Sequence, residues 1–379
     1  MRNVLTAVVL GLGFLFGSPV NGTEASTRAL LALPNAAQAL SAYGGYVVFS
    51  QSDANQSDWK LMVWHAGRVS ALPVTSRSIP FDADVGPDAR GRPAVVYSHC
   101  TSDPTPYQLY PMPDWTFASG CRIYELSLLG GREQLVKRIY AFGSSDSTPS
   151  IWMGAIAFAR ISASRPNESR VMLWRPGRPI RELPGGTFPC MTGARFCPRP
   201  MDVQPQAWVS AMDLGPKVLA FSWALLGDNV LHREAFEMRV DPLGGGRSRL
   251  ADSGNYSEAC TGVSQIVGSP NAAGDQILYV VEDQDICFGD ASTFQTFAPS
   301  VGRWHGASPA TGVIGAAARD GANTYWIQVG LTPPPPPDQH KSINQGDCLP
   351  EHETCTLMLT NNLVLRQEPR RYKPSPPVE

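Results

Sequence analysis

One pattern recurs six times along this chain of 379 residues. Each copy has a short alternating segment, a tight turn that often contains glycine, and an apolar segment that ends near an aromatic residue. The aromatic positions are Phe49, Tyr97, Phe158, Phe221, Tyr279 and Trp326. Repeats of roughly 50–60 residues are units that bury their apolar faces by packing against one another. The chain is therefore expected to stack six similar units.

The stretch from Phe81 to Ile139 shows the repeating unit most clearly. Its alternation and turn residues predict four strands, at Phe81–Val85, Ala94–Ser98, Arg122–Leu128 and Glu133–Ile139. A comparable second hairpin follows every copy, and the last one is predicted at Leu357–Arg366 around an Asn-Asn turn. Each unit is therefore expected to be a four-stranded antiparallel sheet.

Four-stranded units repeated at this length are typical of propeller blades. The sequence predicts an all-β fold, a six-bladed β-propeller that spans residues 26–367. A count of five or seven blades is the alternative, because Arg28–Leu33 could add a strand that closes the ring. A pair of packed sheets is the alternative architecture, although it would not need matched repeats.

Two of the turns carry a more specific motif. GPDARGRPAVVYS at Gly86–Ser98 and SPNAAGDQILYVV at Ser269–Val281 resemble the Ser-Pro-Asp-Gly signature of TolB-type, WD40-like propeller repeats. The other four copies keep only the turn and the strand. That family is functionally diverse, so the resemblance implies the fold and leaves the activity open.

The N-terminus has the features of an export signal. Arg2 precedes an apolar run from Val4 to Phe16, and small residues follow near Ala25. We interpret residues 1–25 as a secretory signal peptide, with an uncleaved anchor as the alternative, because the run is shorter than the roughly 20 residues of a membrane span. A secreted, periplasmic or cell-surface protein is expected, and residues 368–379 are expected to form a disordered tail.

Eight cysteines in an exported chain indicate disulfides. Sequence proximity favours four local pairs, Cys100–Cys121, Cys190–Cys197, Cys260–Cys287 and Cys348–Cys355. In a propeller the loops joining second and third strands lie on the same face as the connections between blades. Every cysteine falls in such a loop, so we call this face the disulfide face. The opposite face, the turn face, is expected to carry tight turns such as Leu129–Gly131.

The disulfide face is the predicted binding surface, because functional loops generally lie on a rigid scaffold. Its most aromatic loop, Thr101–Gly120, contains Tyr107, Tyr110 and Trp115, which could form a platform for a ligand or a cover for its own blade. Asp82 and Asp84 are predicted on the innermost strand of blade two. They could serve acid–base chemistry or ligand binding, or simply line a polar channel.

Several functional classes have no support in the sequence. The net charge is −2 with no sustained basic run, which disfavours nucleic acid as a partner. The six histidines form no ligand-like pair, so no metal or cofactor is expected. A binding module for an extracytoplasmic protein or glycan is the leading hypothesis. The alternatives are a carbohydrate-active hydrolase or lyase at the mouth of the central channel, and a purely structural surface protein.

Overall fold

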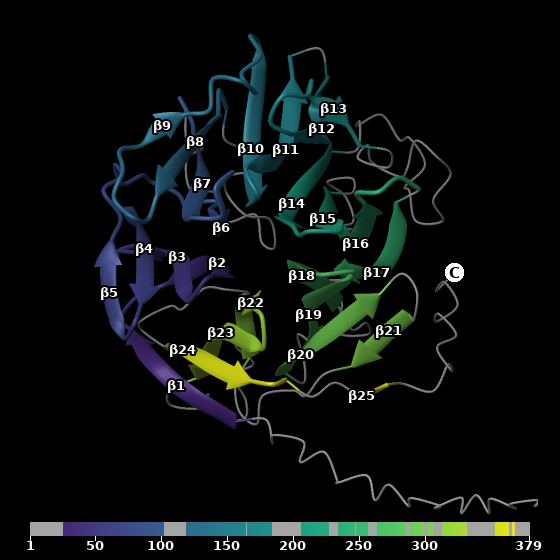
Figure 1. The fold of residues 1–379 in the computed structure, drawn as a ribbon. Coiled ribbons are helices and arrows are strands. Elements are labelled where there is room, and N and C mark those ends of the chain that lie inside the picture. The colour runs from purple at the N-terminus through teal and green to yellow at the C-terminus, as the bar shows by residue number, and fades with distance from the viewer. Residues whose placement is uncertain are drawn as a thin grey trace, which may run out of the picture.

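The computed structural model describes residues 26–101, 119–163, 165–183, 206–226, 234–246, 248–256, 264–285, 289–298, 302–305, 313–331, 353–363 and 366–367. Over these ranges every regular element is a β-strand, and the strands form six sheets around a ring (Figure 1). None of these residues belongs to a helix suited to cross a bilayer. The predicted all-β, six-bladed propeller is confirmed.

Each blade has four main strands from the centre of the ring outward, in sequence order in the first five blades. A short parallel pairing at Glu168 and Ala207 joins blades three and four, and β25 (Arg366–Gln367) adds a fifth strand to blade five. The innermost strands are β2 (Ala37–Tyr43), β6 (Asp84–Pro87), β10 (Ser144–Trp152), β14 (Gln206–Leu214), β18 (Ser264–Ala273) and β22 (Val313–Asp320). The second strands are β3 (Tyr46–Ser52), β7 (Pro93–His99), β11 (Ala155–Ser162), β15 (Val218–Leu226), β19 (Gln276–Asp285) and β23 (Asn323–Leu331). Tight turns join each of these pairs on the turn face.

The outer half of each blade continues the antiparallel order. The third strands are β4 (Trp59–His65), β8 (Arg122–Ser127), β12 (Arg165–Trp174), β16 (Glu234–Pro242), β20 (Gly289–Ala298) and β24 (Glu353–Asn361). The outermost strands are β5 (Arg68–Ala71), β9 (Gln134–Leu135), β13 (Arg181–Glu182), β17 (Arg249–Tyr256), β21 (Gly302–His305) and, in the last blade, β1 (Ser26–Leu33).

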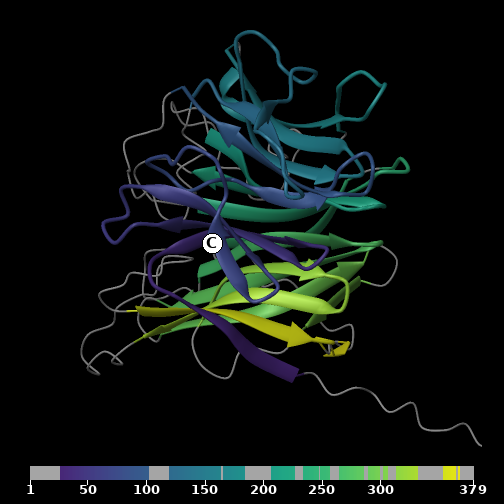
Figure 2. The same cartoon turned by 60° about the vertical axis from the view of Figure 1, so that its left-hand side comes forward.

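The ring closes by strand exchange between the two ends of the chain. The N-terminal strand β1 pairs antiparallel with β24, and the Thr27 and Thr360 hydroxyls lie 3.0 Å apart (Figures 1 and 2). The possible strand at Arg28–Leu33 therefore exists and closes the ring without adding a blade. The predicted hairpin at Leu357–Arg366 is wrong, because β25 (Arg366–Gln367) pairs with β21 of the preceding blade instead.

The six repeating aromatic residues all lie in the core. Each occupies the second strand of its blade, and at most 3% of its surface is exposed. Apolar side chains from adjacent blades meet between the sheets; Val48 of blade one, for example, shares a cluster with Tyr97 of blade two. Each sheet is therefore covered by its neighbours, as the repeat length predicts.

Two strand predictions in blade two are corrected. The innermost strand is β6 at Asp84–Pro87 rather than Phe81–Val85. The predicted strand at Glu133–Ile139 pairs only at β9, because the Lys137 amide turns back to donate to the Leu135 carbonyl at 2.9 Å. Ile139 is buried from a turn and not from a strand, so its apolar character imitates strand alternation.

Five of the innermost strands contain a β-bulge. Their register shifts lie in β2, β10, β14, β18 and β22. Ala39, Thr148 and Ser269 adopt left-handed backbone conformations there, with φ near 50°. A bulge re-aims the side chains that follow it. In β2, β10 and β18, the polar residue two positions further on points toward the neighbouring blade.

Candidate functional site

A ring of polar side chains surrounds the centre of the propeller. One residue on each innermost strand lies opposite the residue that precedes the buried aromatic of its blade; we call this the staple position. Its six occupants are Ser41, Asp84, Ser150, Asp213, Asn271 and Ala318. Five of them accept a hydrogen bond from the backbone of the next blade.

The hydrogen bonds of the staple positions repeat around the ring. They run from Val85 N to Ser41 Oγ (3.0 Å), from Ile151 N to Asp84 Oδ2 (2.8 Å), from Leu214 N to Ser150 Oγ (2.7 Å), from Ala272 N to Asp213 Oδ2 (2.5 Å) and from Arg319 N to Asn271 Oδ1 (3.0 Å). In each case the donor directly follows the staple position of its own blade. Satisfying these buried amides joins adjacent blades at their inner edges.

The sixth staple position breaks the pattern. Ala318 has no side-chain acceptor, and blade six instead reaches blade one through Asp320, whose Oδ2 accepts from the Gly45 amide at 2.8 Å. This contact lies in the hairpin turns rather than within the strands. The blade six–blade one junction is also where β1 closes the ring, so strand pairing replaces the inner staple there.

Two carboxyl groups of this ring share one hydroxyl. Ser150 Oγ donates to Asp84 Oδ2 at 2.7 Å, and Asp213 Oδ1 lies 3.4 Å from the same oxygen. Burial, and then the charge of Asp84, raise the pKa of Asp213 to about 8. Burial also raises the pKa of Asp84, although hydrogen bonds from Ser41 and Ile151 act in the opposite direction. At neutral pH Asp213 is therefore mostly protonated.

Asp82 forms a second hydrogen-bonded contact between blades two and three. Its Oδ1 accepts from the Ser98 amide and hydroxyl, at 2.9 and 2.8 Å, and its Oδ2 accepts from the Thr148 amide at 2.6 Å. Asp84 is only 6% exposed, and its two oxygens are likewise bonded to protein. The carboxylates predicted as channel-facing chemical groups thus hold adjacent blades together.

The disulfide face is anchored by the Cys100–Cys121 disulfide, which is confirmed. It closes the loop between β7 and β8, and the Arg77 guanidinium donates to the Ser98 carbonyl beside it at 3.1 Å. Cys355 is also disulfide-bonded, to a cysteine outside the described residues. The remaining predicted pairs involve Cys190, Cys197, Cys260, Cys287 and Cys348, which lie outside the described residues, as do the loop aromatics Tyr107, Tyr110 and Trp115.

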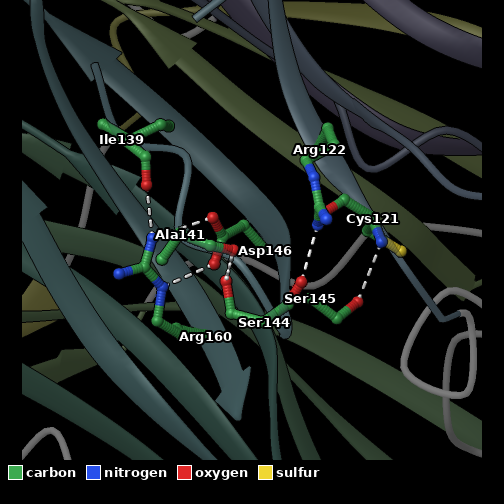
Figure 3. A network of polar contacts seen from close by, with 8 residues as sticks. All are labelled: Cys121, Arg122, Ile139, Ala141, Ser144, Ser145, Asp146 and Arg160. Carbon is green, nitrogen blue, oxygen red and sulfur yellow. Dashed lines mark hydrogen bonds and ion pairs between the residues drawn. The ribbon is translucent and has the colours of Figure 1, made fainter. Parts of the chain in front are cut away.

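Beside this disulfide lies the connection from blade two to blade three, residues 136–143, which we call the link. Figure 3 shows the polar network beneath it. Arg160 of β11 forms a two-pronged ion pair with Asp146 of β10, at 2.7 and 2.9 Å; the Asp146 side chain is buried and that of Arg160 is 14% exposed. Burial raises the pKa of Asp146, while the Arg160 guanidinium lowers it. A charge-assisted pair of this geometry is rigid.

The network fixes three alternate carbonyl groups of the link. Arg160 donates to the Ile139 carbonyl, and Ser144 Oγ donates to the Ala141 carbonyl at 2.9 Å (Figure 3). The Ala163 amide donates to the Gly143 carbonyl at 3.1 Å. The Ile139 side chain is buried in the core between blades two and three. The link is therefore held from below along most of its length.

The side chains between these fixed points face solvent. Phe142 is 95% exposed and Tyr140 is 46% exposed. The Arg122 guanidinium lies 4.5 Å from the centre of the Tyr140 ring and also donates to the Cys121 and Ser144 carbonyls. The network thus displays two aromatic rings and an arginine on a rigid support. This surface was not predicted from the sequence, because residues 133–139 were assigned to a strand.

Among the residues that the structure describes, no three His, Cys, Asp or Glu side chains converge as a metal site would require. His99, at the end of β7, lies 3.2 Å from Glu133. Its ring lies among Phe81, Tyr97 and Tyr124. This histidine is thus part of an aromatic cluster under the disulfide face.

Comparisons with known proteins assign no family to this chain. No protein-family model matches the sequence, and no curated protein matches it either. A puromycin-hydrolyzing peptidase of Mycobacterium tuberculosis superposes with a TM-score of 0.41 and 11% identity, over 80% of this chain and 53% of the peptidase, so this chain spans about half its length. An ulvan lyase superposes with a TM-score of 0.43 and 10% identity, over 91% and 87% of the two chains.

A third similar structure is a separate propeller domain. The β-propeller domain of the Trilobed protease from Pyrococcus furiosus superposes with a TM-score of 0.37 and 7% identity, over 78% of this chain and 79% of the domain. The six-bladed propeller is established by the strands of this chain itself, and the resemblance to TolB-type repeats goes no further than this fold. Propellers of this kind occur in proteins of different activities, so the site of this chain has to be interpreted from its own residues.

Proposed function

We propose that this protein is an exported binding module that captures an extracytoplasmic glycan or protein through the disulfide face. The observation that carries the proposal is the link, where Phe142 and Tyr140 are exposed although a buried ion pair and three fixed carbonyl groups hold their backbone. Binding to such a preorganised surface loses little conformational freedom. A propeller with degenerate TolB-type repeats would serve here as the scaffold.

The central carboxylates support binding over catalysis. A hydrolase or lyase at the channel mouth would need a carboxyl group free to exchange protons with its substrate. The carboxyl oxygens of Asp82 and Asp84 accept hydrogen bonds from backbone amides and serine hydroxyls of their own and the adjacent blades. Their contacts fit a structural role, and the exposed rings at the link fit contact with a ligand.

Export rests on the sequence of residues 1–25, which we interpret as a secretory signal peptide. Sequencing the N-terminus of the protein recovered from the medium or periplasm tests this interpretation. An N-terminus near Ser26 is expected. A full-length chain retained on the membrane would support the uncleaved anchor instead.

The binding role can be tested with paired variants of opposite faces. The double variant Tyr140→Ala/Phe142→Ala removes the exposed rings of the link. The control Leu129→Ala/Met153→Ala removes side chains that are 59% and 52% exposed on the turn face. On arrays of extracellular glycans and peptides, the control should keep every signal of the wild-type protein, and the link variant should lose them. Equal signals from both variants, or no wild-type signal, would contradict the proposal.

A further inference from the structure

The link surface carries an unusual charge for this chain. Three cations lie on or beside the link, namely Arg122, Lys137 and Arg138, although the whole protein has a net charge of −2. Lys137 and Arg138 are exposed, and the Arg138 guanidinium lies 5.7 Å from the centre of the Trp174 ring. A local excess of one charge on a slightly acidic protein attracts ligands of the opposite charge.

Acidic side chains near the link are mostly engaged elsewhere. Asp146 is bound to Arg160, and Glu133 lies against His99. Glu125 lies close enough for the charges of Arg138 and Arg92 to lower its pKa, but burial raises that pKa and has the larger effect. The outer surface of the link therefore presents more positive than negative charge.

Cations and aromatic rings lie close together on this surface. Arg122 stacks on Tyr140, and the exposed Lys137 and Arg138 belong to the same link as the two rings. The centre of a protein–protein interface is depleted of charged residues and covers about 800 Å² per partner. Two rings and two cations on one short link, with Arg122 beside it, suit a smaller ligand that combines flat apolar faces with anionic groups.

From these observations we infer that the link surface binds an acidic polysaccharide, with a sugar ring on Phe142 and its carboxylate or sulfate groups on Arg122, Lys137 and Arg138. This inference rests on the proposed binding function and names its ligand class. A guanidinium matches the geometry of carboxylate and sulfate oxygens. An aromatic side chain offers a large apolar face at low cost in conformational entropy.

The test uses two acidic polysaccharides, polygalacturonate and chondroitin sulfate, and two control polymers that separate charge from sugar rings. Polygalacturonate has both features, its fully methyl-esterified form has the same rings without charge, and poly-glutamate has charge without rings. Binding to the full-length protein is measured by titration calorimetry at low and high salt. We expect polygalacturonate or, for a sulfate-selective site, chondroitin sulfate to bind at least tenfold more tightly than the other two polymers, and more weakly at high salt.

Matched variants locate the binding surface. Phe142→Ala and the double variant Lys137→Gln/Arg138→Gln should each weaken binding of the acidic polysaccharide at least tenfold. Leu129→Ala, which changes an exposed residue on the turn face, should leave binding unchanged. Circular dichroism and melting temperature should be the same for all of these proteins, because the altered side chains are exposed.

The remaining outcomes overturn the inference in distinguishable ways. Equal binding of the esterified polymer would show that charge is not recognised, and equal binding of poly-glutamate would show that sugar rings are not recognised. Either result leaves the general binding function standing. Failure of both acidic polysaccharides to bind also overturns the ligand class, and only the array experiment then decides whether the disulfide face binds anything.

Discussion

The centre of the ring and the link both contain buried carboxylates, but the two regions satisfy them in opposite ways. Asp84 and Asp213 share the Ser150 hydroxyl and accept from backbone amides, and no cation pairs with either of them in the part of the chain that the structure describes. Asp146 is matched by the guanidinium of Arg160. The first arrangement joins blades through neutral donors, and the second fixes a segment that exposes aromatic rings.

The two regions are therefore expected to have different roles: the centre stabilises the fold, and the link carries the proposed binding surface. The staple positions are repeated around the ring, so each of the five polar ones stabilises one junction between adjacent blades. The Arg160–Asp146 pair (Figure 3) lies under a single link, the one that carries the exposed Tyr140 and Phe142. Changes at the centre should therefore alter folding stability, whereas changes on top of the link should alter binding alone.

Breaking the buried ion pair should have the largest effect. Asp146→Ala leaves the Arg160 charge buried without its partner, and we expect a loss of roughly 3–5 kcal/mol in the free energy of unfolding. Urea denaturation measures it. Glu182→Ala, which breaks the more exposed pair with Arg170, should cost about 1 kcal/mol or less. If Asp146→Ala costs no more than Glu182→Ala, the ion pair does not support the link.

The paired carboxyl groups at the centre should make stability depend on pH. The pKa of Asp213 is raised to about 8 in the folded protein, so its contribution is complete below about pH 4, where the unfolded chain also holds the proton, and is lost as pH rises to about 8. A full shift corresponds to about 1.4 kcal/mol per pH unit. Because Asp213 keeps partial exposure, we expect a decline of roughly 3 kcal/mol in total.

The control for this pH dependence is Asp213→Asn. An amide oxygen can still accept from the Ala272 backbone but does not titrate. Denaturation at several pH values should give a flatter profile for this variant between pH 4 and pH 8. An unchanged slope would assign the pH dependence to other groups.

Close approach of blades two and three at the centre should make Gly86 hard to replace. A Cβ on Gly86 would lie 2.1 Å from the Ile151 carbonyl oxygen, so the strands would have to separate. We expect Gly86→Ala to cost about 2 kcal/mol in unfolding free energy. Gly244→Ala, where a Cβ meets no atom within 4 Å, should be nearly neutral. Equal melting temperatures for the two variants would contradict the packing described for the inner edge.

Filling the sixth staple position should have the smallest effect, and a favourable one. Ala318→Ser places a hydroxyl where the other five blades have an acceptor, which should raise the unfolding free energy by about 0.5–1 kcal/mol. Ala317→Ser is the matched control, because Ala317 faces an apolar cluster and a hydroxyl there is expected to be destabilising. Loss of stability in both variants would mean that Ala318 is not equivalent to the staple positions.

The sequence predicted the blades because their core residues repeat at regular intervals. Phe49, Tyr97 and their counterparts are buried for the same reason in every blade, so their spacing alone indicates the architecture. Four of the polar staple positions also follow the repeat, since aligning the copies on these aromatics brings Ser41, Ser150, Asp213 and Asn271 into one column with Ala318. Asp84 does not fall in that column, because the turn between β6 and β7 is longer, and only its pairing with Val96 shows that it is equivalent.

Closure and the link could not be predicted in the same way. The hydroxyls of Thr27 and Thr360 meet across 333 positions of sequence, and no local pattern encodes such a pairing. The link was hidden because Ile139 is apolar and buried, as a strand residue would be. Tyr140 and Phe142 are exposed because Arg160 and Ser144 donate to carbonyl groups of the link. Every residue type has a backbone carbonyl, so these contacts cannot be recognised in the sequence.

Hydrogen exchange of the amide groups tests the central claim most directly, with and without polygalacturonate. If the link is the binding surface on a rigid ring, added ligand should slow exchange at residues 136–143 and at the adjoining end of β8. Exchange at the turn-face residues Leu129–Gly131 and Met153–Gly154 should stay unchanged. Protection confined to the turn face or to the inner strands would contradict the account.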